Sequence, residues 1–186
     1  GPYFKGGMKP IKVVIDREQD RAAPRGTGDI KAGGNYASSI LSGEKAHDLG
    51  YSNVMYLDAA EHKYIEECGA ANFFGIRDGL YVTPKSPSIL PSITNKSLRQ
   101  LAEDMGLKVE ERHIPVEELD RFDEAGACGT AAVISPIESI YDLDTGKMVT
   151  YGKEVGKYSL ELYTQLQDIQ YGRREDKYGW CVVVEE

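Results

Sequence analysis

The chain has 186 residues, of which 41% are hydrophobic and 28% are charged, as is ordinary for a globular protein with one substantial core. Its formal net charge of −8, with acidic and basic residues mixed along the sequence, argues against nucleic acid as a partner. No apolar run is long enough to span a bilayer, and the start lacks a basic-then-apolar signal pattern, so we expect no membrane association and a cytoplasmic location.

The first elements are predicted from apolar patterning and glycine. The β-branched run Ile11–Ile15 predicts a strand, which a charged loop follows. A glycine-rich segment, Gly26–Tyr36, comes next and contains Lys31. Apolar residues in Tyr36–Leu49 recur with helical spacing, and Gly50 is a stop signal after them. Lys31 is therefore expected just before a helix.

Short aromatic and β-branched runs with turn signals between them predict antiparallel strands in the middle of the chain. They are Asn53–Leu57, Tyr64–Cys68, Asn72–Ile76 and Leu80–Thr83. The pair Asp78-Gly79 marks a hairpin turn between the last two. The segment Thr94–Met105 predicts a helix whose apolar face comprises Leu98, Leu101, Ala102 and Met105.

Strands and helices are also predicted in the last third. They are a strand at Leu107–His113, a short acidic helix at Pro115–Phe122, a turn at Gly126–Thr130, a strand at Ala131–Ile134, a hairpin of Ile140–Leu143 and Lys147–Tyr151, and a last strand or ordered tail at Trp180–Val184. An amphipathic helix is expected at Tyr158–Ile169, with Leu160, Tyr163, Leu166 and Ile169 facing inward.

The cysteines and histidines predict no metal site and no disulfide. Cys68, Cys128 and Cys181 are widely separated, so reduced thiols are the default. The three histidines lack the spacings that are typical of zinc ligands.

Lys31 is the strongest candidate for chemistry. The glycines around it lack side chains, so a large flat molecule can approach its amine, although such a segment is more often a solvated loop. Pyridoxal phosphate needs an amine, a carboxylate for its ring nitrogen, a donor for its ring oxygen, and amides and hydroxyls for its phosphate. Glu67 lies in an apolar strand context, where a carboxylate requires a cationic partner such as a pyridinium.

The phosphate group has candidates in two other segments. Ile93 and Thr94 open a helix, where free amides and the helix dipole favour an anion, and Thr130 adds a hydroxyl from another turn. Each residue also has a plainer interpretation. A strand glutamate usually faces solvent, Thr94 is more often a helix cap, and Thr130 is more often only a turn residue.

Five segments in the same order resemble the branched-chain amino acid aminotransferases, which are class IV (fold type IV) pyridoxal phosphate enzymes. The resemblance covers nearly the whole chain and is carried by Gly26–Tyr36, Glu67–Phe74, Ile89–Thr94, Gly129–Val133 and Asp168–Gly172. The Lys31 segment and the late Ile-Gln-Tyr-Gly stretch favour the branched-chain type over a D-amino acid aminotransferase or an aminodeoxychorismate lyase. A further alternative is an isolated domain without activity.

The resemblance implies roles for individual residues. Lys31 would form the Schiff base with pyridoxal 5'-phosphate and move the proton at the substrate α-carbon, Tyr36 would bind the ring oxygen, and Glu67 would pair with the ring nitrogen. Ile93, Thr94 and Thr130 would hold the phosphate. The amides of Thr130 and Ala131 would face the substrate carboxylate, while Gly69 and Ala70 would line the pocket for an aliphatic side chain. Asn95 and Tyr81 depart from the family pattern.

The resemblance also implies a fold and an assembly. We expect a mixed α+β fold with a strand-rich pseudo-barrel flanked by helices. Residues 1–186 would form the carboxy-terminal, cofactor-binding domain, with the amino-terminal small domain absent from this chain. The intact enzyme would be a homodimer that transfers the amino group of leucine, isoleucine or valine to 2-oxoglutarate.

Overall fold

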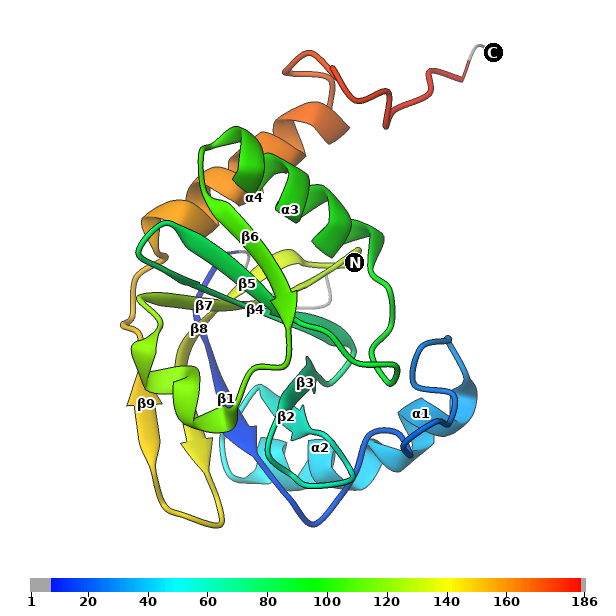
Figure 1. Cartoon of the computed structure of the whole chain (residues 1–186), viewed down its shortest axis with the longest axis vertical. Coiled ribbons are helices and arrows are strands. Elements are labelled where there is room, and N and C mark those ends of the chain that lie inside the picture. The colour runs from blue at the N-terminus through cyan, green and yellow to red at the C-terminus, as the bar shows by residue number, and fades with distance from the viewer. Residues whose placement is uncertain (1–7, 185–186) are drawn as a thin grey trace.

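The computed structural model describes residues 8–184, which fold around one nine-stranded sheet (Figure 1). The strands are β1 (Ile11–Ile15), β2 (Asn53–Leu57), β3 (Ile65–Cys68), β4 (Ala71–Arg77), β5 (Leu80–Pro84), β6 (Lys108–Arg112), β7 (Glu124–Gly129), β8 (Val133–Asp142) and β9 (Met148–Thr150). The helices are α1 (Gly33–Ser38), α2 (Ile40–Asp48), α3 (Ile93–Asp104), α4 (Lys157–Gln170) and the 3-10 helix η1 (Val116–Arg121).

The sheet closes on itself. Strand β3 pairs with both β2 and β4, which completes a ring in the order β3, β2, β1, β8, β7 and β4. Strands β5 and β6 continue from β4, and β9 pairs with β8. The pairs β1–β2, β1–β8 and β5–β6 are parallel, and the other pairs are antiparallel. The predicted strand-rich barrel with flanking helices is confirmed.

Three apolar clusters form the core of the described residues, and the two larger ones lie on opposite faces of the strands, while the smallest joins Ala46 of α2 to β1 and β2. Phe73 belongs to the cluster within the barrel, and its neighbour Phe74 belongs to the cluster beneath α3 and α4. This division follows from the alternation of side chains along a strand. Figure 1 shows α3 and α4 together at one end of the molecule, with α1 and α2 at the other. No helix within residues 8–184 is long and apolar enough to cross a membrane.

The helical segment after Lys31 differs from the prediction. It divides at Ser39 into α1 and α2 and begins at Gly33 rather than Tyr36. Its buried positions include Ser42 and Ala46, whereas Ile40, Leu41 and Leu49 are 59%, 62% and 52% exposed. The side of α2 that packs on the barrel carries small residues, since Ser42 hydrogen-bonds the buried phenol of Tyr56 and Ala46 joins an apolar cluster of β1 and β2.

Strands β7 and β8 are longer than predicted. The turn expected at Gly126–Thr130 is wrong, because β7 extends through Gly129 and the turn comes after it. A Cβ on Gly126 would collide with the ring of Phe74, so this glycine serves close packing within a strand. The predicted strands Ala131–Ile134 and Ile140–Leu143 are parts of one continuous strand, β8.

The carboxy-terminal elements need two further corrections. In α4 the buried apolar residue of the first turns is Leu162, whereas Leu160 is 49% exposed. The segment Trp180–Val184 forms no strand, and its three valines are at least 85% exposed. The remaining predicted strands and helices lie within a few residues of their observed bounds.

Candidate active site

The loop that carries Lys31 is shaped by a buried asparagine at the start of α1. Asn35 Nδ2 donates to the carbonyl oxygens of Thr27, at 2.7 Å, and Ile30, at 3.0 Å. The hydroxyl of Thr27 donates to Asn35 Oδ1 at 3.0 Å. These bonds close the loop around the backbone just before Lys31. Sequence reasoning missed Asn35, although an asparagine directly after two glycines is a signal for such a local turn.

The loop packs tightly against the segment that precedes α3. A Cβ on Gly28 would collide with the carbonyl oxygen of Ser88, so only glycine permits this approach. The glycines around Lys31 therefore allow close packing, in addition to the predicted approach of a flat molecule to the Lys31 amine.

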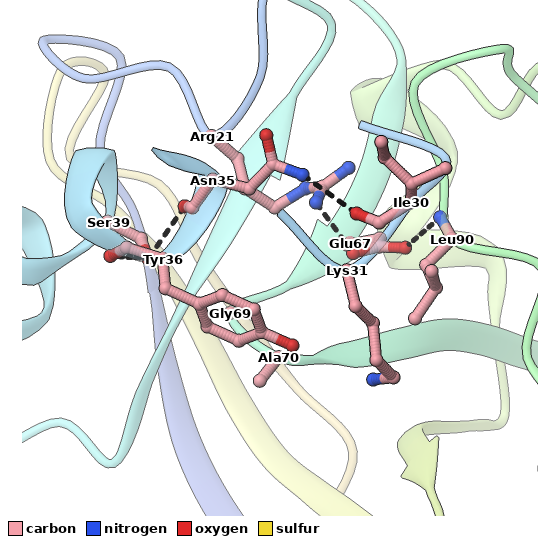
Figure 2. Close-up of a pocket in the computed structure, with 10 residues that line it drawn as sticks. All are labelled: Arg21, Ile30, Lys31, Asn35, Tyr36, Ser39, Glu67, Gly69, Ala70 and Leu90. Atoms are coloured by element: carbon pink, nitrogen blue, oxygen red, sulfur yellow. Dashed lines mark hydrogen bonds and ion pairs between the residues drawn. The ribbon is translucent and has the colours of Figure 1, made fainter. Parts of the chain in front are cut away.

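Five predicted site residues line one pocket (Figure 2). They are Lys31, Tyr36, Glu67, Gly69 and Ala70, and the other lining residues are Arg21, Ile30, Asn35, Ser39 and Leu90. Lys31, Tyr36 and Ala70 are exposed, whereas Arg21 and Glu67 are only 6% and 3% exposed. The pocket thus combines an accessible amine and phenol with a buried ion pair.

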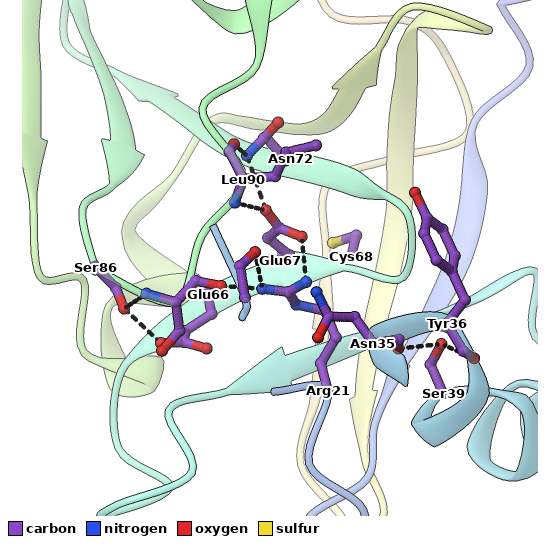
Figure 3. Close-up of polar contacts among 12 residues, drawn as sticks. Arg21, Asn35, Tyr36, Ser39, Glu66, Glu67, Cys68, Asn72, Ser86 and Leu90 are labelled. Carbon is purple, nitrogen blue, oxygen red and sulfur yellow. Dashed lines mark hydrogen bonds and ion pairs between the residues drawn. The ribbon is translucent and has the colours of Figure 1, made fainter. Parts of the chain in front are cut away.

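Glu67 on β3 is bound through both carboxylate oxygens (Figure 3). Its Oε1 accepts hydrogen bonds from the amide of Leu90 at 2.7 Å and from Asn72 Nδ2 at 3.2 Å. Its Oε2 lies 3.2 Å from Arg21 Nη1. Burial nevertheless raises the pKa of Glu67 to about 7, because the loss of hydration outweighs the attraction of Arg21 and the hydrogen bond from Leu90.

Arg21 is the principal residue that sequence reasoning missed. Besides Glu67, its guanidinium donates to the carbonyl oxygens of Ser88 and Gly28. It therefore joins the Lys31 loop, β3 and the segment before α3. The cationic partner expected for Glu67 is present within the chain itself. The only signal in the sequence is an arginine ten residues before Lys31, in a segment that otherwise resembles a charged loop.

The other predicted site residues, Ile93, Thr94, Thr130 and Ala131, are not among those that line the pocket. Ile93 is 74% exposed at the start of α3, and Thr94 beside it is buried. Thr130 and Ala131 are exposed in the turn between β7 and β8. This turn lies near the pocket, since a Cβ on Gly129 would be 3.9 Å from the carbonyl oxygen of Ala70. Their roles stay predictions.

The two departures from the family pattern contact each other. The hydroxyl of Tyr81 on β5 donates to Asn95 Oδ1 at 2.8 Å, and Asn95 Nδ2 donates to the hydroxyl of Thr83 at 2.8 Å. All three side chains are buried. Because Asn95 lies in the first turn of α3, this network fixes the beginning of that helix on β5.

Comparisons with known proteins agree with the geometry. The chain is 50% identical to the branched-chain-amino-acid aminotransferase of Helicobacter pylori over 187 residues, 99% of this chain and 54% of that protein. The crystal structure of the Escherichia coli branched-chain amino acid aminotransferase superposes with a TM-score of 0.80 at 33% identity, over 97% of this chain and 58% of that one. The Thermobaculum terrenum enzyme in its PLP form gives a TM-score of 0.77 at 33% identity, over 89% of this chain and 52% of that one.

The chain thus spans about half the length of the curated relatives it matches. Residues 3–140, which are most of the chain, match the family described as amino-transferase class IV. With the fold and the grouping of Lys31, Tyr36 and Glu67 in one pocket, this match shows that the chain belongs to the class IV amino-transferase family.

Proposed function

We propose that this chain is the cofactor-binding part of a branched-chain amino acid aminotransferase. The reaction would transfer the amino group of leucine, isoleucine or valine to 2-oxoglutarate with pyridoxal 5'-phosphate as cofactor. The observation that carries the proposal is the pocket in which Lys31, Tyr36 and Glu67 meet. The names of the Helicobacter pylori and Escherichia coli proteins support the substrate class, and the PLP form of the Thermobaculum terrenum enzyme supports the cofactor.

The residues of the pocket fit this cofactor. Lys31 supplies an exposed amine and Tyr36 an exposed phenol, beside a carboxylate that is buried enough to prefer a cationic partner. A carboxylate oxygen accepts more than one hydrogen bond, so Glu67 retains room for a ring N–H besides its contacts with Arg21, Leu90 and Asn72. Bound there, the cofactor would supply a ring that withdraws electrons from the substrate α-carbon.

Each side chain would then have a distinct task. Lys31 Nζ would hold the cofactor at its aldehyde carbon and would serve as the base that takes and returns the proton of the substrate α-carbon. Glu67 would face the ring nitrogen, and Arg21 would favour the ionised form of that carboxylate and hold it in place. Tyr36 would donate to the ring oxygen. We retain Ile93, Thr94 and Thr130 as the residues that would bind the phosphate. The amides of Thr130 and Ala131 would face the substrate carboxylate, and Gly69 and Ala70 would line the pocket for the substrate side chain.

We also propose that residues 1–186 are the carboxy-terminal domain of a longer enzyme that works as a cytoplasmic homodimer. The length of the relatives supports a further domain, since this chain covers 54% of the Helicobacter pylori protein. The side chains of Ile30, Tyr36 and Ile40 are exposed beside the pocket. Their exposure supports a further domain or a second subunit that covers this surface, because apolar groups at a site are usually buried in the assembled protein. Three free cysteines are consistent with a reducing compartment.

Covalent trapping tests the role of Lys31. The chain is incubated with pyridoxal phosphate, reduced with borohydride and digested, and the modified peptide is identified by mass spectrometry. We expect the label on Lys31 at stoichiometric yield, loss of that label in Lys31→Ala, and no change in Lys96→Ala, which removes an exposed lysine on α3. Equal labelling of the chain and Lys31→Ala would remove Lys31 from the mechanism.

The substrate class is tested separately on the protein that includes the preceding domain. Loaded protein is mixed with L-leucine or with D-alanine, and conversion of the cofactor to its amine form is followed by absorbance. We expect conversion with L-leucine only. Conversion with D-alanine alone would assign the protein to a sister activity of the class, and conversion with neither would favour an inactive binding unit.

A further inference from the structure

A second buried carboxylate lies next to Glu67 on the same strand. Glu66 is 4% exposed, and successive residues of a strand face opposite sides, so its side chain leaves β3 away from the pocket. Its Oε1 accepts the hydroxyl of Ser86 at 2.6 Å. Burial raises the pKa of Glu66. None of the tasks assigned above to the pocket uses this residue.

The hydrogen-bond direction at Ser86 is fixed by its neighbours. The Ser86 hydroxyl oxygen accepts the amide of Ser88 at 3.0 Å, and its single proton is directed to Glu66. The Ser86 side chain thus ties β3 to the beginning of the segment 86–90, which turns before α3. Figure 3 shows Glu66 and Ser86 together at the left, with Leu90 above Glu67 and Arg21 below it.

Backbone groups of the segment 86–90 bind both members of the buried ion pair, Arg21 and Glu67. The carbonyl oxygen of Ser88 accepts from the Arg21 guanidinium, and the amide of Leu90 donates to Glu67 at 2.7 Å. Both are backbone groups, so their positions depend on the path of the segment. The Glu66–Ser86 contact is the side-chain bond that ties the start of this segment to β3, next to Glu67.

We propose that Glu66 is a positioning residue, which through Ser86 fixes the segment 86–90 and thereby holds Arg21 and Glu67 in the geometry that the cofactor ring requires. Its importance for catalysis rests on the function proposed above. The contacts themselves lie wholly within this chain and are testable without cofactor.

Glu66 acts on Glu67 in two opposed ways. Its negative charge disfavours the ionised form of Glu67, whereas its bond to Ser86 keeps Leu90 and Arg21 where they favour that form. Besides Arg21 and Glu66, the other charged group that influences Glu67 is Lys31, and the charged groups that influence Glu66 are Arg21, Asp58 and Asp20. Glu67 in turn raises the pKa of the buried thiols of Cys68 and Cys128, after the larger effect of burial. These groups are unchanged in the variants below.

The two effects separate experimentally. The titration midpoint of Glu67 is measured by NMR in the chain labelled with carbon-13 at glutamate carboxyls, with Glu67→Gln identifying the signal. Ser86→Ala removes the tie and leaves both carboxyl groups in place, so we expect the midpoint to rise by about 0.5 to 1 pH unit, the equivalent of one hydrogen bond. Glu66→Gln keeps an acceptor for Ser86 and removes the charge, so the midpoint should fall.

Two controls and a second readout complete the test. Ser86→Thr retains the hydroxyl and should restore the original midpoint, and Ser97→Ala removes a hydroxyl that only bonds within α3. Amide exchange of Leu90 should accelerate several-fold in Ser86→Ala and remain slow in Glu66→Gln. An unchanged midpoint and unchanged Leu90 exchange in folded Ser86→Ala would overturn the proposal. If Ser86→Ala does not fold, accelerated Leu90 exchange in Glu66→Gln overturns it.

The outcome is independent of the function proposed above. Failure of pyridoxal phosphate to label Lys31 would remove the proposed reaction and leave the Glu66 result standing. Normal labelling of Lys31 together with an unaltered Glu67 midpoint in Ser86→Ala would leave the proposed reaction standing and overturn the role of Glu66.

Discussion

At the scale of single residues, the titration of Glu67 decides how the site behaves. Three donors from separate segments surround this carboxylate, yet burial raises its pKa from the ordinary 4.5 to about 7. The carboxylate is therefore poised near neutrality in the chain without cofactor. A cationic ring nitrogen beside it would favour the ionised form, so Glu67 and a pyridinium would stabilise each other.

The first prediction concerns stability against pH. Folded Glu67 binds a proton more tightly than unfolded Glu67, so its stabilising contribution is present below pH 4.5 and is lost as the pH rises to about 7. The loss is on the order of 3 kcal/mol. Glu67→Gln does not titrate, so its free energy of unfolding from urea denaturation should fall less over this range. The raised pKa of Glu66 contributes in the same direction in both proteins. Equal slopes of the unfolding free energy against pH in the original chain and in Glu67→Gln would contradict the raised pKa of Glu67.

The second prediction concerns Arg21. In Arg21→Met the buried Glu67 loses its cation, and two backbone carbonyls lose a donor. We expect a destabilisation of about 3 kcal/mol at pH 8 and less at pH 6, where Glu67 is already protonated. Arg173→Met is the matched control, since the Arg173–Asp168 pair is 57% and 32% exposed and should contribute less than about 1 kcal/mol. A loss in Arg21→Met that is equal at both pH values would argue against coupling to Glu67.

The sequence predicts the residues of the site better than it predicts their partners. Lys31, Tyr36 and Glu67 share a pocket as the resemblance implies. Arg21 and Asn35 escape notice because their importance comes from contacts. An arginine in a charged loop has no pattern of its own, and its contact with Glu67 spans 46 positions of sequence. Only the closed barrel brings the two segments together.

At the scale of elements, local pattern determines the strands better than the faces of the helices. Short β-branched and aromatic runs predict β2 to β5 closely, and Asp78-Gly79 forms the expected hairpin, with φ angles of 47° and 73° that suit these residues. Helix α2 does not follow its pattern, because its large apolar side chains, Ile40 and Leu41, face outward. Helical periodicity identifies an apolar face, but it does not say whether the barrel, another domain or another subunit covers that face.

The third prediction tests the network at the start of α3. Tyr81→Phe leaves Asn95 Oδ1 buried without its donor, so we expect a destabilisation of about 1 to 2 kcal/mol by urea denaturation. Adding Asn95→Leu should cost less than the sum of the single changes, because both polar partners are then absent. Tyr171→Phe, at a side chain that is 67% exposed, should have little effect. Strict additivity of the two substitutions would show that the bond has no energetic role.

At the scale of the whole molecule, the closed barrel explains why distant segments form one site. The Lys31 loop follows β1, Glu67 is the residue before the last of β3, and the turn with Thr130, which lies near the pocket, joins β7 to β8. The ring order β3, β2, β1, β8, β7 and β4 brings these strands together. Strand patterning predicts the members of the sheet, but it does not state their order, since β1 pairs with β8 across more than 120 positions of sequence.

The last prediction concerns the apolar face formed by Ile30, Tyr36 and Ile40, which borders the pocket. If a second copy covers this face, the chain should associate reversibly in sedimentation experiments. Ile40→Gln should weaken association about tenfold or more, because burial of an isoleucine side chain contributes about 1.5 to 3 kcal/mol. Its folding stability should change by less than about 0.5 kcal/mol, since Ile40 is 59% exposed. Leu160→Gln, at an exposed site on α4, should alter neither property. Equal association of Ile40→Gln and the original chain would move the interface elsewhere.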